Sequence, residues 1–212
     1  GIYMGLTALE IILLLCGGMG FFDALNTGFA SAGTGGFGVR NNNMAAYSHY
    51  SQVVIAIFLV LFGTNFSFYI MLLTKKFKQA FKMEELWLYI GIIAVSTLII
   101  SVNISSLYPT AYESFHQGFF YVTSIISTAG FGIDDVNRWP ELSKAVIIII
   151  TFIGAMAGST GGGFKVSRIL ILCKEVRKEF ALLVHPRNVR TVKLDGKTVD
   201  HNIMRTTSVF LV

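Results

Sequence analysis

The sequence of 212 residues has little cysteine, little proline and little charge. Two Cys cannot form a disulfide framework, and three Pro among 18 Phe and 8 Tyr are not the composition of a linker or a coiled coil. Only 14% of the residues are charged, whereas soluble domains usually have about 25%. Because 53% are hydrophobic, a disordered chain is also excluded. A polytopic membrane protein remains, provided that the apolar residues form runs of about 20.

The apolar residues do form such runs. Residues 52–73 and 86–107 carry no charge and are long enough to span a bilayer. Further apolar runs lie at 2–16, 145–157, 166–173 and 209–212. Because the sequence begins without Met and ends inside an apolar run, we expect it to be a piece of a longer protein.

The positive charges predict an orientation in the membrane. Of the 17 Lys and Arg, four lie in residues 75–82 and ten in residues 165–205. By the positive-inside rule, both blocks face the cytoplasm. The net charge of +5 therefore indicates topology, since a nucleic-acid partner would require a basic face on a soluble fold. We predict a multi-pass protein of the plasma (inner) membrane that contacts lipid and binds no nucleic acid. Within the second block, residues 174–197 are interpreted as an anchor at the anionic inner leaflet or as a docking surface for a cytoplasmic regulator.

Two connections on the outer side are too apolar for ordinary loops. Residues 21–32 and 112–126 are about three helical turns long and rich in Ser, Thr and Ala. Segments of this length are typical of re-entrant helices rather than of spans. Each one leads into a glycine motif and then into another span. The predicted unit is therefore a span, a half-length helix, a glycine turn and a second span.

The unit occurs twice, with TGGFGV at 34–39 and TAGFGI at 128–133, 94 positions later. Gly36 and Gly130 permit backbone angles that direct successive carbonyls to one side. A ring of carbonyls can replace the water shell of a cation, and the C-terminal end of the preceding helix also favours a cation. We therefore predict an ion filter formed by Thr34, Gly35, Gly36, Phe37, Thr128, Ala129, Gly130 and Phe131. Close helix packing through small residues is the competing interpretation.

A third glycine cluster interrupts the fourth apolar run. Three adjacent Gly, at about 1 kcal/mol each relative to Ala, are expected to break a helix. The freed carbonyls and hydroxyls would line a cavity below the filter as a mobile gate, formed by Gly158, Ser159, Thr160, Gly161, Gly162, Gly163 and Lys165. A phosphate-binding loop does not fit, because Phe164 separates the last Gly from Lys165. Asn65 and Ser67 interrupt the second apolar run at the corresponding place.

With these motifs the sequence resembles the Trk/Ktr/HKT superfamily of potassium transporters, and within it the TrkH type. The AGSTGGG-x-K-V-x-R run at 157–168 is the most specific element. The resemblance implies an all-α polytopic membrane protein built from repeated span–pore helix–filter loop–span units around a potassium-channel-like pore. It assigns residues 1–82 to the second of four repeats and 83–181 to the third, which contains the glycine-rich gate. Residues 182–202 would form a cytoplasmic connection, and 203–212 would begin the next repeat.

The resemblance also implies a function. It predicts transport of K⁺ across the plasma membrane, with K⁺ bound only at the filter residues, no cofactor and no enzymatic activity. The implied partners are a second copy, forming a homodimer, and a cytoplasmic nucleotide-binding regulatory subunit. The alternative is an integral-membrane enzyme with a re-entrant active site. It would need convergent acid, base or nucleophilic groups at one depth, and the spans show neither paired carboxylates nor a Ser/His/Asp set.

Overall fold

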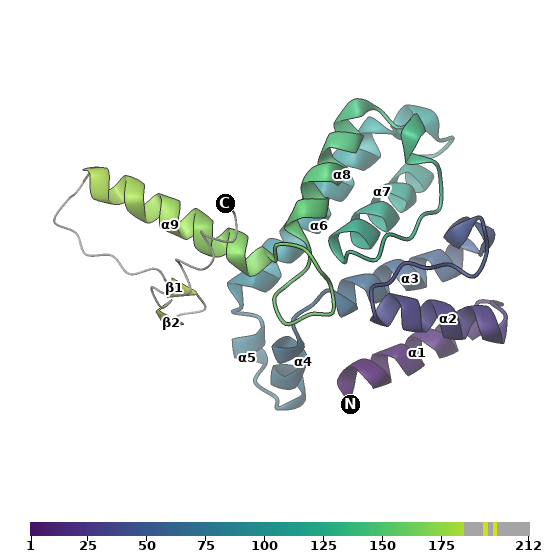
Figure 1. Cartoon of the computed structure of the whole chain (residues 1–212), viewed down its shortest axis with the longest axis horizontal. Coiled ribbons are helices and arrows are strands. Elements are labelled where there is room, and N and C mark those ends of the chain that lie inside the picture. Colours follow the sequence, from purple (N-terminus) through teal and green to yellow (C-terminus); the bar gives the residue numbers. More distant parts are fainter. Residues whose placement is uncertain (185–192, 195–196, 199–212) are drawn as a thin grey trace.

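Two groups of three helices form the body of the protein in the computed structural model, which describes residues 1–184, 193–194 and 197–198. Within each group the three helices contact one another, and α3 packs on α7 to join the groups (Figure 1). The first group contains α1 (Ile2–Cys16), α2 (Phe21–Ala32) and α3 (His49–Phe62). The second contains α6 (Glu84–Asn103), α7 (Ala111–Ile126) and α8 (Glu141–Ile153).

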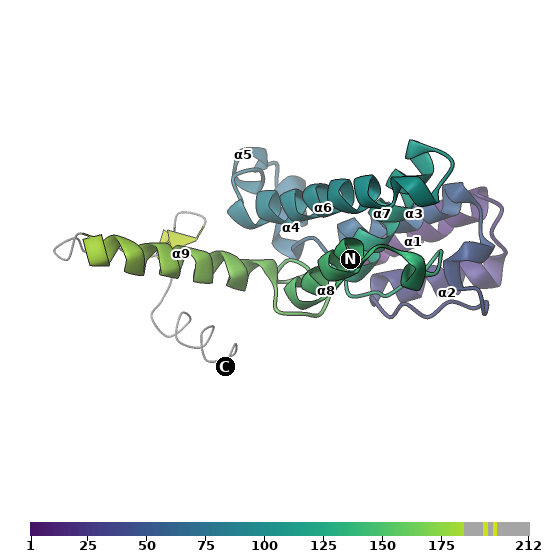
Figure 2. The same cartoon turned by 90° about the horizontal axis from the view of Figure 1, so that it is seen from above.

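Shorter elements connect and extend these groups. They are the helices α4 (Phe66–Leu73) and α5 (Phe77–Ala80), and the 3₁₀ turns η1 (Asn43–Ala46), η2 (Ser105–Leu107) and η3 (Val136–Arg138). Helix α9 (Val166–Val184) projects away from the body (Figures 1 and 2). Beyond it, β1 (Lys193–Leu194) pairs antiparallel with β2 (Lys197–Thr198). Most of the connection predicted at 182–202, and all of the repeat start predicted at 203–212, lie outside the described residues.

The two predicted half-length helices are present as α2 and α7. The observed bounds, Phe21–Ala32 and Ala111–Ile126, match the predicted ones within one residue. Asp23 and Glu113 lie in the first turns, where a carboxylate suits the positive end of the helix. The Thr110 side chain caps α7 by accepting a hydrogen bond from the Glu113 N–H at 3.2 Å. Both helices therefore have clear starts and end at the glycine loops.

The apolar run at 52–73 is divided at residues 63–65, where Asn65 and Ser67 predict an interruption. Helices α3 and α4 on either side are bent by 89°. Gly63 ends α3, and the Asn65 carboxamide oxygen accepts a hydrogen bond from the Ser67 N–H at 2.8 Å to start α4. The sequence stays hydrophobic across the bend, so within the sequence only these capping residues indicate where the helix breaks.

Helix α6 has the side-chain distribution of a membrane helix. With 20 residues it is long and apolar enough to span by itself, the bent pair α3–α4 could form a second span, and α1 is apolar but shorter. The buried polar residues of α6 are Glu85, Ser96, Thr97 and Ser101. Its exposed residues include Trp87, Val95, Leu98 and Val102. Polar groups facing the helix bundle and apolar groups facing outward are expected where the surrounding medium is lipid.

Helices α6 and α7 approach closely at Gly118. A Cβ placed there would lie 2.6 Å from the Ser101 hydroxyl and 3.3 Å from the Thr97 carbonyl oxygen. The same hydroxyl donates to the Thr97 carbonyl at 2.6 Å, so it has little freedom to move aside. Gly118 thus permits the close backbone contact that small residues provide between membrane helices.

Replacing Gly118 with Ala should destabilise the protein by about 1–3 kcal/mol, because the added methyl group pushes α6 and α7 apart. Gly91→Ala is the matched control, since a Cβ at Gly91 of α6 meets nothing within 4 Å and gains the same helix propensity. Thermal unfolding in detergent measures the difference. Equal melting temperatures for the two variants would contradict the proposed packing.

Candidate functional site

The two short glycine loops, residues 33–39 and 127–133, share the same pattern of positive φ angles. In each, a Thr and the Gly two positions later have positive φ. The φ angles are 50° at Thr34, 68° at Gly36, 63° at Thr128 and 82° at Gly130. The sequence duplication therefore extends to the backbone at the residues predicted to form the filter.

Helices α2 and α7 also end in the same way. The Gly35 N–H bonds to the Ala30 carbonyl at 2.8 Å, and the Ala129 N–H bonds to the Ser124 carbonyl at 3.0 Å. In a helix end of this kind, Gly usually occupies the left-handed position. Here Thr34 and Thr128 occupy it, at a cost of about 1–2 kcal/mol for a residue with a Cβ. Such strain persists only where other contacts hold the residue in place.

Both Thr hydroxyls contact the long glycine loop, residues 154–165, which connects α8 to α9. The Thr34 hydroxyl lies 3.3 Å from the Thr160 carbonyl of this loop and 2.8 Å from the Gly33 carbonyl, so its one proton is shared between two acceptors. The Thr128 hydroxyl accepts a hydrogen bond from the Gly162 N–H at 2.6 Å. These contacts bring together the residues predicted as filter and those predicted as gate. The contact at Thr128 requires a hydroxyl at a position where Gly would be less strained.

The two short loops touch each other as well. A Cβ at Gly36 would overlap the Ala129 carbonyl oxygen, so only Gly fits there. Beyond the first loop, the Met44 N–H of η1 donates to the Gly132 carbonyl at 3.0 Å. The surroundings differ, since Phe131 is buried at 1% exposure and Phe37 is exposed at 81%.

Most backbone carbonyls of the two loops have no partner within the described part of the chain. The Phe131 carbonyl accepts a hydrogen bond from the Ser124 hydroxyl at 2.8 Å, which turns it toward α7. Among residues 1–184, no hydrogen bond reaches the carbonyls of Thr34, Gly35, Gly36, Phe37, Thr128, Ala129 or Gly130. Irregular backbone at membrane depth is tolerated only where it is buried in protein or lines a watery cavity. Unpaired carbonyls there can coordinate a cation.

The long loop is closed on itself by glycine. Gly154 and Gly163 have φ of 72° and 80°, and a Cβ at Gly163 would lie 2.7 Å from the Gly154 Cα. The loop end returns to α8, where the Lys165 N–H donates to the Ile153 carbonyl at 2.9 Å. The Lys165 ammonium donates to the Gly161 carbonyl. Two chain segments thus cross where neither can carry a side chain.

The long loop fits into the bend between α3 and α4. The Met156 N–H donates to the Gly63 carbonyl at 3.1 Å, and the Phe66 N–H donates to the Gly158 carbonyl at 3.0 Å. The Thr160 hydroxyl is 3.3 Å from the Phe62 carbonyl. The bend therefore exposes backbone groups of one helix group, and the loop of the other group satisfies them.

Glu85 holds the long loop from a third side, a role that the sequence did not reveal. Its side chain is buried at 4% exposure, and one carboxylate oxygen accepts hydrogen bonds from the Ala157 and Ser167 N–H groups. A Glu at the start of an apolar run usually faces solvent, and nothing near it in the sequence indicates these distant partners.

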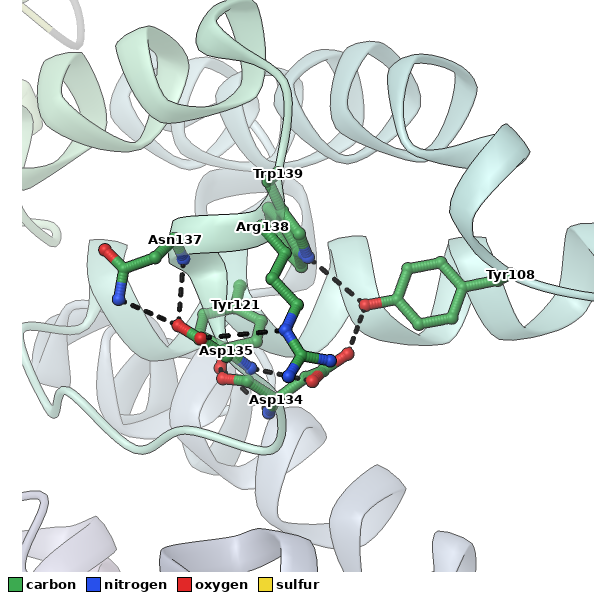
Figure 3. Close-up of polar contacts among 7 residues, drawn as sticks. All are labelled: Tyr108, Tyr121, Asp134, Asp135, Asn137, Arg138 and Trp139. Atoms are coloured by element: carbon green, nitrogen blue, oxygen red, sulfur yellow. Dashed lines mark hydrogen bonds and ion pairs between the residues drawn. The ribbon is translucent and has the colours of Figure 1, made fainter.

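A polar cluster fixes the outer end of residues 127–133 (Figure 3). The Tyr121 hydroxyl donates to the Asp134 carbonyl and accepts from the Asp134 N–H at 2.9 Å and the Ile133 N–H at 3.3 Å. The Tyr108 hydroxyl donates to the Asp134 carboxylate and accepts from the Trp139 indole N–H at 3.2 Å. Burial and the Asp134 carboxylate raise the pKa of Tyr108 above its ordinary value, which keeps this donor protonated. Sequence analysis missed this cluster.

Removing the Tyr121 hydroxyl should destabilise the protein by about 1–3 kcal/mol, because Tyr121→Phe leaves two N–H groups of the loop exit unpaired. Tyr112→Phe on the exposed side of α7 is the control and should be close to neutral. Thermal unfolding in detergent compares the two. A Tyr121→Phe variant as stable as the control would show that the cluster does not hold the loop.

Comparison with known proteins identifies a family of the same sequence pattern and fold. A family profile named TrkH and described as "Cation transport protein" matches residues 15–212. The Trk system potassium uptake protein TrkH of Escherichia coli K12 is 34% identical over 209 residues, which cover 96% of this chain and 43% of that protein. The Trk system potassium uptake protein TrkG of the same strain is 30% identical over 205 residues, covering 93% of this chain and 42% of that protein.

A solved structure is also similar. The crystal structure of the potassium transporter TrkH from Vibrio parahaemolyticus matches with a TM-score of 0.92 and 30% sequence identity. The match covers 99% of this chain and 46% of that chain. This chain therefore spans less than half the length of the relatives that it matches.

Proposed function

The chain belongs to the TrkH family of cation transport proteins, and we propose that it forms the second and third of four pore repeats in a potassium transporter. The proposed repeats are residues 1–82 and 83–181, followed by a cytoplasmic connection at 182–202 and the start of another repeat at 203–212. The chain covers 43% of a TrkH relative, which is close to the half that two of four repeats would occupy. The protein is an all-α membrane protein of a transporter family, so it is not an enzyme.

The proposed filter is formed by residues 34–37 and 128–131, where dehydrated K⁺ is bound. The observation that carries this proposal is the pair of strained Thr residues, whose positive φ leaves a row of unpaired carbonyls beside them. The Phe131 carbonyl accepts a hydrogen bond from Ser124, so we assign ion contact in that loop to residues 128–130. The buried Phe131 ring is assigned a packing role. The C-terminal ends of α2 and α7 point at the filter and add negative potential.

The proposed gate is the long glycine loop, with Gly158, Ser159, Thr160, Gly161, Gly162, Gly163 and Lys165 as its moving part. Its contacts with Thr34 and Thr128 support this proposal, because a loop next to the proposed filter would obstruct ion flow. We propose that it opens by leaving the bend between α3 and α4. The glycines allow this because they permit several backbone conformations.

The proposed partners follow from the same family. The transporter would lie in the plasma membrane as a homodimer, with a cytoplasmic nucleotide-binding regulatory subunit. Helix α9 carries Lys174, Arg177 and Lys178 and projects from the body (Figure 2). We assign this helix to the cytoplasmic side, where it would meet anionic lipid headgroups or the regulator.

Replacing Gly130 with Ser in the full-length protein should lower the K⁺ over Na⁺ preference about tenfold, because a side chain at φ 82° costs about 1–2 kcal/mol and shifts the adjacent carbonyls. Gly35→Ala is the control. It converts TGGFG into the TAGFG of the other loop, and its Cβ would meet nothing nearer than 3.5 Å. Competitive ⁸⁶Rb⁺ uptake measures selectivity. Unchanged selectivity in Gly130→Ser would overturn the filter assignment.

Deleting residues 161–163 from the full-length protein should raise basal K⁺ flux, since the shortened loop cannot reach Thr34 and Thr128. Flux of ⁸⁶Rb⁺ into liposomes without the regulatory subunit measures the effect, normalised to folded transporter by gel filtration. Rescue of potassium-uptake-deficient cells at low external K⁺ confirms that the parent protein is active. A folded deletion variant with the basal flux of the parent would exclude the loop as a gate.

A further inference from the structure

We propose that Glu85 is the latch that holds the long glycine loop closed, an inference that rests on the proposed function of this loop as the gate. Glu85 is a positioning residue in this scheme, because it contacts the loop and not the ion. The role follows from where its carboxylate lies, between the two ends of the loop.

One oxygen of the Glu85 side chain joins two distant backbone groups. The Ala157 N–H donates to it at 2.6 Å, and the Ser167 N–H donates to the same oxygen at 3.1 Å. Ala157 precedes the glycine cluster and Ser167 lies in the first turn of α9. The carboxylate therefore fixes both arms of the loop to the start of α6, so the loop cannot leave without breaking at least one of these bonds.

The electrostatic setting makes these bonds strong. The first turn of a helix has unpaired N–H groups and a positive potential, which favour an acceptor with negative charge. Glu85 supplies this acceptor to α9, and its charge also attracts the nearby Lys165 ammonium. At 4% exposure water competes poorly, so hydrogen bonds to the carboxylate are stronger than those between neutral groups.

The latch also connects the loop to α9. The neighbouring residue Glu84 pairs with Lys174 of α9, so α9 is fastened to the first turn of α6 at two points. A displacement of α9 would pull Ser167 away from Glu85 and release one arm of the loop. In this scheme, a movement of α9 on the proposed cytoplasmic side would be transmitted through Glu85 to the gate.

The test uses the full-length transporter in liposomes and compares Glu85→Ala with Glu85→Gln and Glu84→Gln. Glu85→Ala removes the acceptor, so basal ⁸⁶Rb⁺ flux per folded transporter should rise about tenfold, with K⁺ over Na⁺ selectivity unchanged. Glu85→Gln keeps an acceptor oxygen without the charge and should give an intermediate rise. Glu84→Gln removes the second attachment of α9, a partly exposed ion pair with Lys174, and should give a smaller rise than Glu85→Gln because exposed ion pairs contribute little.

The deletion of residues 161–163 separates the possible outcomes. If the deletion raises flux and folded Glu85 variants do not, the latch is overturned and the gate stands. If neither raises flux, the gate itself fails. A purely structural role for Glu85 would lower flux or selectivity, which also overturns the inference.

A labelling experiment covers the case in which Glu85→Ala does not fold. Ser159→Cys, placed in a background without other cysteines, reports on the loop. Adding the nearly isosteric Glu85→Gln should increase its labelling rate by a thiol reagent applied from the cytoplasmic side. An unchanged labelling rate together with unchanged flux would contradict the latch.

Discussion

Two threonines in a left-handed backbone conformation lie where the two short glycine loops meet the long one. Thr34 and Thr128 end the helices α2 and α7 at positions where glycine would be less strained. Their conformation turns the following carbonyls away from the helix, and their hydroxyls bond to the loop between α8 and α9. The same residue type at each position thus belongs to the proposed filter and contacts the loop next to it. The strain is balanced by contacts that only a hydroxyl-bearing side chain provides.

The two helix groups have the same plan and use it differently. In the first group, the chain bends by 89° between α3 and α4. In the second group, residues 154–165 separate α8 from α9 and fill that bend through hydrogen bonds to Gly63, Phe66 and Phe62. The backbone groups left unpaired at the bend form hydrogen bonds with those of residues 154–165. This pairing matters because unpaired backbone groups are costly at membrane depth. The proposed gate therefore lies between the two helix groups and depends on both.

The sequence predicted the elements of the site better than the contacts between them. Helix α2 matches its predicted bounds because length, apolar content and the following glycines are local signals. The break at Asn65 is also local, since a capping side chain acts on a residue two positions away. Glu85, by contrast, contacts Ala157 and Ser167, which are far away in the sequence. The Tyr121 cluster at the loop exit could not be predicted for a related reason, because Tyr is common in apolar helices and its hydroxyl finds partners only once the loop has folded.

The central claim is that the carbonyls beside Thr34 and Thr128 bind the transported ion. Anomalous scattering from Rb⁺ in crystals of the full-length protein tests it most directly. The account predicts an anomalous peak between residues 34–36 and 128–130, within coordination distance of their carbonyl oxygens. It also predicts that Na⁺ does not displace this peak. Rb⁺ bound elsewhere in the pore, with no peak at these carbonyls, would contradict it.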